Sequence, residues 1–191
     1  MGVYIVVGVI VLVVLLLLGY IIKKRNNFVV MRNRIKDQQA QIDVQLKRRY
    51  DLIPNLIETA KGYACFEKST LEAVAKARAT ALGAKSLDES MAANEQLTGM
   101  LHRILAVGES YPELKANSNF MQLQNELSAT EDKIAKARQF FNDTVLKYNN
   151  AIQVFPASMV AGMCGFKEYQ FLEAAESERE SIKISSDTFQ F

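Results

Sequence analysis

The sequence has no tryptophan, only three prolines and only nine glycines among its 191 residues. Proline and glycine are the residues that most often interrupt a helix, so their scarcity permits long helices. Alanine, leucine, lysine, glutamate and glutamine are plentiful, and such residues lose little or no rotamer freedom in a helix. The composition therefore favours helix over strand.

Cysteine and histidine are also scarce. Cys65 and Cys164 match neither a zinc-ligand spacing nor a disulfide framework, so we predict two small buried residues, with a disulfide as the alternative. His102, the single histidine, has no cysteine or acid pair at ligand spacing. Phosphate-binding glycine loops, nucleophile elbows and HExxH sequences are absent as well. The sequence therefore predicts no catalytic residue, no metal site and no cofactor, and an enzyme is the less favoured interpretation.

Residues 3–22 form an uninterrupted apolar run, VYIVVGVIVLVVLLLLGYII. As a helix, a run of this length spans roughly 30 Å, the thickness of the hydrocarbon core of a bilayer. Tyr4 and Tyr20 lie near its two ends, where amphipathic rings suit the headgroup layer. A cleaved signal peptide is the alternative, but it needs a basic segment before the run and a small-residue cleavage site after it. We therefore predict a transmembrane anchor over residues 1–25.

Basic residues dominate the stretch that follows the anchor. Between residues 23 and 49 there are nine basic and two acidic side chains. Such a segment suits an anionic lipid surface, and no accompanying motif favours nucleic acid as a partner. Because positive charge accumulates on the cytoplasmic side of a span, we predict an N-terminus outside and the bulk of the chain in the cytoplasm, with a periplasmic domain as the alternative. The predicted lipid-facing collar consists of Lys23, Lys24, Arg25, Arg32, Arg34 and Lys36.

Apolar residues recur at helical spacing directly after this basic segment. No glycine or proline interrupts residues 23–53, so the anchor can continue into a long helix. Pro54 interrupts the pattern, and Asp51 can cap a new helical segment that holds Pro54 in its first turn. We therefore predict a kink near Tyr50. The apolar positions are Ile35, Ile42, Leu46, Ile53, Leu56, Ala60 and Tyr63.

A second apolar stripe is the clearest pattern in the chain. Between residues 120 and 152 apolar side chains recur at steps of three and four, which is typical of a long bundle helix or a coiled-coil seam. Packing within one chain is favoured over an oligomer seam. Shorter helices are predicted at 69–83, 94–110 and about 167–181, with a connection at 86–91. The stripe consists of Phe120, Leu123, Leu127, Thr130, Ile134, Ala137, Phe141, Val145, Tyr148 and Ile152.

The predicted fold is all-α, with one N-terminal transmembrane helix and an up-down bundle of about four long helices. The bundle is expected over residues 26–184 and a tail over 185–191. Residues 154–166, VFPASMVAGMCGF, are uncharged and too short to span a bilayer as a helix. They can cap the bundle, enter the membrane interface or meet a partner, and capping is the first expectation.

Several polar residues lie within or beside the apolar stripes. Buried polar groups need hydrogen-bond partners, so an internal network that fixes helix register is one interpretation, and a polar docking surface is the other. The residues concerned are Arg49, Asp51, Asn55, Arg138, Asn142 and Asn149.

The sequence resembles the LemA family of bacterial membrane proteins. The resemblance is carried by RNRIKDQQAQIDVQLKRRYDLIPNLIETAKGYACFE at 32–67, by ESYPELKANSNFMQLQNELSATEDKIAKARQFFNDTVLKYNNAIQVFP at 109–156 and by the GF pair at 165–166. It implies an N-terminal membrane helix, a long-helix bundle and no known enzymatic activity, in the bacterial inner membrane. The motif positions are Arg49, Asp51, Pro54, Asn55, Arg138, Asn142, Tyr148, Asn149 and Pro156.

The expected function is a non-catalytic, membrane-anchored scaffold or adaptor of the bacterial envelope, linked by the resemblance to membrane stress or proteolysis. Its expected partners are the lipid bilayer and other membrane or cytoplasmic proteins, with a homo-oligomer as a further expectation. The alternative is a membrane-shaping oligomer that engages lipid through the basic juxtamembrane segment and the apolar residues 154–166.

Overall fold

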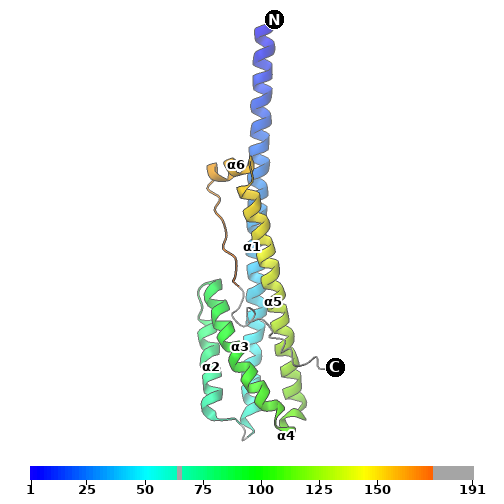
Figure 1. Cartoon of the computed structure of the whole chain (residues 1–191), viewed down its shortest axis with the longest axis vertical. Helices are drawn as coiled ribbons and strands as arrows, with labels where there is room; N and C mark the ends of the chain where they lie inside the picture. The colour runs from blue at the N-terminus through cyan, green and yellow to red at the C-terminus, as the bar shows by residue number, and fades with distance from the viewer. Residues whose placement is uncertain (64–65, 174–191) are drawn as a thin grey trace, which may run out of the picture.

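A computed structural model describes residues 1–63 and 66–173, which contain six helices and no strand (Figure 1). The all-α prediction is confirmed. The long helices run alternately away from the N-terminal span and back toward it, as expected for an up-down bundle. The predicted tail at 185–191 lies outside the described residues. The helices are α1 (Gly2–Lys61), α2 (Lys68–Leu82), α3 (Leu87–Glu109), α4 (Pro112–Lys115), α5 (Ser118–Gln153) and α6 (Ala157–Met163).

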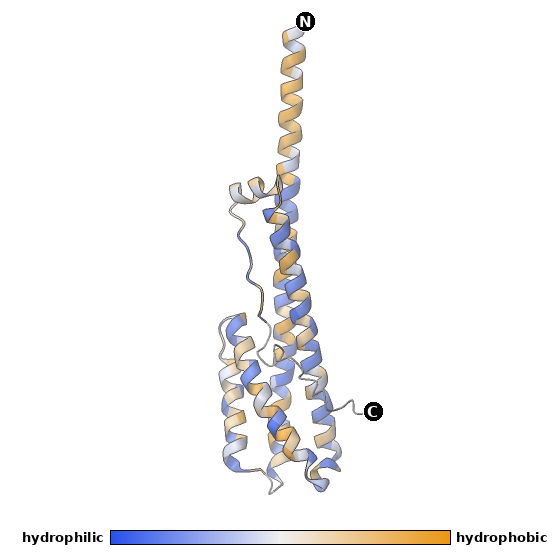
Figure 2. Cartoon of the chain, viewed as in Figure 1, coloured by the Kyte–Doolittle hydropathy of each residue, from blue (hydrophilic) through white to orange (hydrophobic). Residues whose placement is uncertain are grey.

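Helix α1 is continuous over 60 residues. Its first part, residues 2–19, is exposed on every side and projects alone beyond the rest of the molecule (Figure 2). Within the described residues, α1 is the one helix long and apolar enough to cross a membrane. The anchor and the bundle therefore share one helix, since no breaker separates them in the sequence.

The new helical segment predicted to begin at Asp51 is wrong, and the kink near Tyr50 stays a prediction. Pro54 lies inside α1 without ending it, and Asp51 is an ordinary helical residue rather than a cap. A proline within a helix leaves the carbonyl four residues before it without its amide donor. That carbonyl belongs to Tyr50, and it accepts a hydrogen bond of 2.7 Å from Nε of Arg78 on α2. A side chain from a neighbouring helix thus replaces the donor that Pro54 lacks.

Helices α1 and α5 pack side by side in opposite directions (Figure 1). All ten residues of the stripe predicted between 120 and 152 are buried in this single chain, so packing within the chain is confirmed. On α1, Phe28, Ile35, Ile42 and Arg49 follow one another at intervals of seven and are all buried. This heptad spacing is that of an antiparallel coiled coil.

Helices α2 and α3 cover only the half of the α1–α5 pair that lies far from the span (Figure 1). We call this part the distal half. The connection predicted at 86–91 is shorter than expected, because α3 already begins at Leu87. Ser86 caps it by accepting a hydrogen bond from the Glu89 amide, and Glu89 accepts one from the Lys85 amide. This reciprocal arrangement is close to that of a capping box.

After α5 the chain turns through a cis Phe155–Pro156 peptide into α6 and then runs back along the bundle (Figure 1). Three residues of α6, Ala157, Val160 and Ala161, are buried, so the segment caps the bundle with one face. The helix predicted at 167–181 is wrong over 167–173, which are extended, and its remainder lies outside the described residues. Cys164 is exposed rather than buried, and Cys65 lies outside the described residues.

Candidate functional site

The extended segment 166–173 is attached to α5 by two asparagine side chains, which we call the asparagine clamp. Asn149 donates to the Tyr169 carbonyl at 2.9 Å and accepts from the Tyr169 amide at 3.0 Å. Asn142, two helical turns away, makes the same pair of bonds with Leu172, both at 2.9 Å. Each amide side chain therefore satisfies the donor and the acceptor of one backbone residue, as a neighbouring strand would.

Two more α5 side chains extend the clamp. The Tyr148 hydroxyl donates to the Lys167 carbonyl at 3.0 Å, and Nη2 of Arg138 donates to the Glu173 carbonyl at 2.7 Å. Burial raises the pKa of Tyr148, which keeps its hydroxyl protonated as a donor. Four of the motif positions named in the sequence analysis thus share one task, because a segment without regular structure must find backbone partners elsewhere.

We expect Asn149→Ala to release this segment locally without unfolding the helices. The substitution removes two neutral hydrogen bonds, each contributing about 1 kcal/mol, so the open state should become roughly tenfold to thirtyfold more populated. The rate of tryptic cleavage after Lys167, which is exposed, measures this opening. Asn150→Ala is the matched control, because the adjacent Asn150 is exposed. Equal cleavage of the two variants would contradict a role for the clamp.

Arg49 forms a second polar cluster, where α1, α3 and α5 meet. Its side chain is almost fully buried. Nη1 donates to Oδ1 of Asn94 at 3.1 Å and to Oγ1 of Thr98 at 2.8 Å, and Nη2 lies 3.5 Å from a carboxylate oxygen of Glu131. One guanidinium therefore links three helices, which is the task that a planar group with five donors performs well.

Two effects act on the pKa of Arg49 in opposite directions. Burial lowers its pKa, while the Glu131 carboxylate acts in the opposite direction. A guanidinium nevertheless stays protonated in proteins. The same oxygen of Glu131 lies 3.3 Å from Nε2 of His102, whose side chain is largely exposed. His102 therefore stands at the rim of the Arg49 cluster, in contact with solvent.

Asp51, Pro54 and Asn55 are exposed on the distal part of α1. Positions three and four apart lie on one face of a helix, so these three residues form a single patch, which we call the distal face. This patch is separate from the Arg49 cluster, whose members are buried or half-buried on the other side of α1. The structure thus divides the sequence motif RRYDLIPNL into an internal part and an exposed part.

The predicted basic collar is spread over a long distance. Lys24 lies over the Tyr20 ring, at 5.7 Å from its centroid, and Lys23 and Arg25 stand beside it on α1. Arg32 lies over the Phe166 ring at 5.6 Å. At 1.5 Å per residue, Arg32, Arg34 and Lys36 lie about 15–21 Å beyond Ile22, outside a headgroup layer of roughly 5–8 Å. Lys23, Lys24 and Arg25 lie closest to the apolar run, and the contact of the collar with lipid stays a prediction.

A groove of about 490 Å³ separates the extended segment from the start of α3. Arg32 and Gln39 of α1 and Asp88 of α3 line it, together with backbone and side chains of the segment. Across the described residues, no group of three or more His, Cys, Asp or Glu side chains could hold a metal ion.

Sequence reasoning missed several partners of these polar residues. Asn94, Thr98 and Glu131 complete the Arg49 cluster, and Arg78 supports Pro54. Only Arg49 itself left a signal, since it occupies a heptad position that continues Phe28, Ile35 and Ile42. The other residues occupy unremarkable places in their own helices.

Comparison with known proteins gives consistent relatives. The sequence profile of the LemA family matches residues 38–185. Protein LemA of Metamycoplasma hominis is 24% identical over 166 residues, covering 85% of this chain and 74% of that protein. Magnetosome protein MamQ of Magnetospirillum gryphiswaldense is 24% identical over 177 residues, covering 79% of this chain and 65% of that protein. Magnetosome protein MamQ 2 of Paramagnetospirillum magneticum is 23% identical over 179 residues, covering 80% of this chain and 66% of that protein.

Proposed function

This chain belongs to the LemA family, and from that premise we propose that it is a non-catalytic scaffold which holds a protein partner at a fixed distance from a membrane. The membrane-associated helical character comes with the family and with the apolar start of α1. The scaffold role is our own proposal. Its partner is a second protein that binds the distal half of the bundle.

One observation carries this proposal, namely the continuity of α1 from the apolar run to the distal half. Residues 23–61 extend over about 58 Å as a helix. From Phe28 onward, α1 is stiffened by packing against α5 and, in the distal half, by α2. A partner bound to the distal face would therefore stand at a defined height above the bilayer, because no flexible linker intervenes within α1.

We propose further that the bundle lies in the cytoplasm, anchored in the bacterial inner membrane. The support is the charge pattern, since Lys23, Lys24 and Arg25 directly follow the apolar run. The opposite orientation would place these three cations on the side of the membrane where such residues are depleted.

Photo-crosslinking in native membranes tests both proposals. We expect a photoreactive residue at Asp51 or at Asn55 to give the same discrete adduct with another protein, because both positions share the distal face. Asp37 is the matched control. It is exposed, lies on nearly the same side of α1 and is about 21 Å closer to the membrane.

The scaffold proposal fails if Asp37 gives the same adduct as Asp51 and Asn55, or if the distal positions capture only lipid or only a second copy of this chain. Mass spectrometry of the adduct also tests the orientation. A partner whose soluble part lies wholly in the periplasm contradicts a cytoplasmic bundle.

A further inference from the structure

Helix α6 and the turn before it leave an apolar stripe uncovered. Phe155 is 76% exposed, Met159 is 61% exposed and Met163 is 77% exposed. Met159 and Met163, four residues apart, lie on one side of α6, and Phe155 lies in the turn before the helix. Val154 is also exposed, at 62%, whereas Ala157, Val160 and Ala161 pack against the bundle. This short helix therefore has one face that is used inside the molecule and one apolar face that is not.

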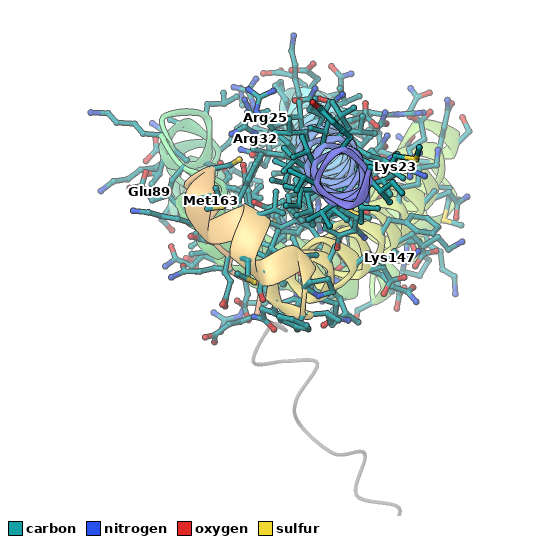
Figure 3. The ribbon with its side chains drawn as sticks, turned by 90° about the horizontal axis from the view of Figure 1, so that it is seen from above. Lys23, Arg25, Arg32, Glu89, Lys147 and Met163 are labelled. Carbon is teal, nitrogen blue, oxygen red and sulfur yellow. The ribbon has the colours of Figure 1, made fainter. Side chains whose placement is uncertain are left out.

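The position of α6 relative to the apolar span is informative. The helix lies across the axis of α1, at the base of the projecting apolar part (Figures 1 and 3). Phe166, which follows α6, packs against Phe28 of α1 with ring centroids 5.3 Å apart. Phe28 is about 9 Å beyond Ile22 along the helix. The α6 region is thus held within, or just below, the roughly 5–8 Å headgroup layer that follows the span.

The charges around α6 also fit a lipid surface. Residues 154–166 contain no charged side chain. Viewed along the axis of α1 from its N-terminal end, Lys23, Arg25 and Lys147 lie around the span, and Met163 lies at the end of α6 far from the span, on the side where Glu89 is labelled (Figure 3). An uncharged segment beside a span whose end carries cations suits the interface of an anionic bilayer.

We propose that α6 is a second membrane contact, which lies at the level of the headgroups and turns Phe155, Met159 and Met163 toward the acyl chains. The occupant of this face is the bilayer, because the packing of Phe166 against Phe28 holds α6 beside the end of the apolar span. A seven-residue helix alone would bind lipid weakly, but attachment to a span converts its binding into an intramolecular step at high effective concentration. The inference does not depend on the distal face.

The absence of tryptophan allows a direct measurement, since any introduced tryptophan is the only one in the chain. We expect Phe155→Trp in the full chain, reconstituted in vesicles of phosphatidylcholine and phosphatidylglycerol, to lose roughly half of its fluorescence when the lipids carry bromine near the top of the acyl chains. Phe140→Trp is the matched control. Phe140 is 59% exposed on α5, about 20 Å from the end of that helix, and should not be quenched.

The proposal is overturned if bromolipids quench neither variant, or if Phe155→Trp emission is blue-shifted without quenching, because the face is then covered by protein or by a second copy. Adding Met159→Glu and Met163→Glu to Phe155→Trp should abolish most of the quenching, and unchanged quenching contradicts the assigned face. Both glutamates replace exposed side chains, so circular dichroism should show an intact bundle. Crosslinking at Asn55 should persist in this variant, which separates this test from that of the scaffold.

Discussion

Arg49→Ala should lower the free energy of unfolding by roughly 3 kcal/mol or more. The substitution leaves a cavity where a fully buried side chain stood and removes the donors that Asn94 and Thr98 use. Oδ1 of Asn94, which is buried, then has no donor from α1. The effect is expected to be large because one guanidinium joins three helices, so its loss weakens three contacts at once. Urea unfolding of the full chain in detergent, followed by circular dichroism, measures the change.

Arg48→Ala is the matched control for Arg49→Ala. Arg48 is the preceding residue and carries the same charge, but its side chain is exposed. Its replacement should change the unfolding free energy by less than about 0.5 kcal/mol. Arg49→Met, which keeps most of the volume, should fall between the two. A similar loss for Arg48→Ala and Arg49→Ala would show that the charge of this segment, rather than the buried cluster, stabilises the bundle.

Replacing two glycines of α3 by alanine should give effects of opposite sign. A Cβ at Gly108 would overlap the Phe120 ring, with its Cζ closest and Cε1 at 2.7 Å, and Phe120 is fully buried and cannot swing away. Such overpacking costs roughly 1–3 kcal/mol, more than the gain in helix propensity. At Gly99 a Cβ would meet no atom within 4 Å, so alanine should stabilise the helix by about 0.5–1 kcal/mol.

Thermal unfolding of the two variants beside the parent chain tests this pair. Gly108→Ala should unfold at a lower temperature than the parent and Gly99→Ala at a higher one. If both substitutions stabilise the chain, the contact between the end of α3 and the start of α5 is looser than the structure shows. If both substitutions destabilise the chain, the face of α3 around Gly99 is in contact with another part of the protein or with a second molecule.

The long helices could be predicted from the sequence because their buried positions repeat regularly. Every residue of the stripe between 120 and 152 is buried on α5, and the interval of seven on α1 continues from Phe28 to Arg49. Such periodicity is a local signal, since the buried face of each helix can be identified from its own sequence without knowledge of the helix it packs against.

The continuity of α1 through Pro54 could not be predicted from local rules. A proline in a helical pattern normally ends or bends the helix, because a carbonyl loses its donor. The replacement donor is Arg78, which is distant in the sequence and belongs to another helix. No residue near Pro54 in the sequence predicts the contact with Arg78, so the packing of α2 against α1 is needed to explain why α1 stays continuous.

The helix predicted from residue 167 was wrong for a related reason. Its residues have ordinary helical propensities, and a helix satisfies its own backbone groups. Here Asn142 and Asn149 satisfy the backbone of Leu172 and Tyr169 instead. The sequence signalled these asparagines as polar residues beside an apolar stripe, but it contained no pattern that linked them to a segment lying after α6.

The uninterrupted α1 also makes the molecule a lever whose short arm is immersed in lipid. Membrane-spanning helices tilt to match the thickness of the bilayer, by about 20° on average. Because the arm outside the membrane is about 58 Å long, a change of about 10° in tilt would sweep its far end sideways by roughly 10 Å. A modest thinning or thickening of the bilayer is thereby converted into a displacement as wide as a helix.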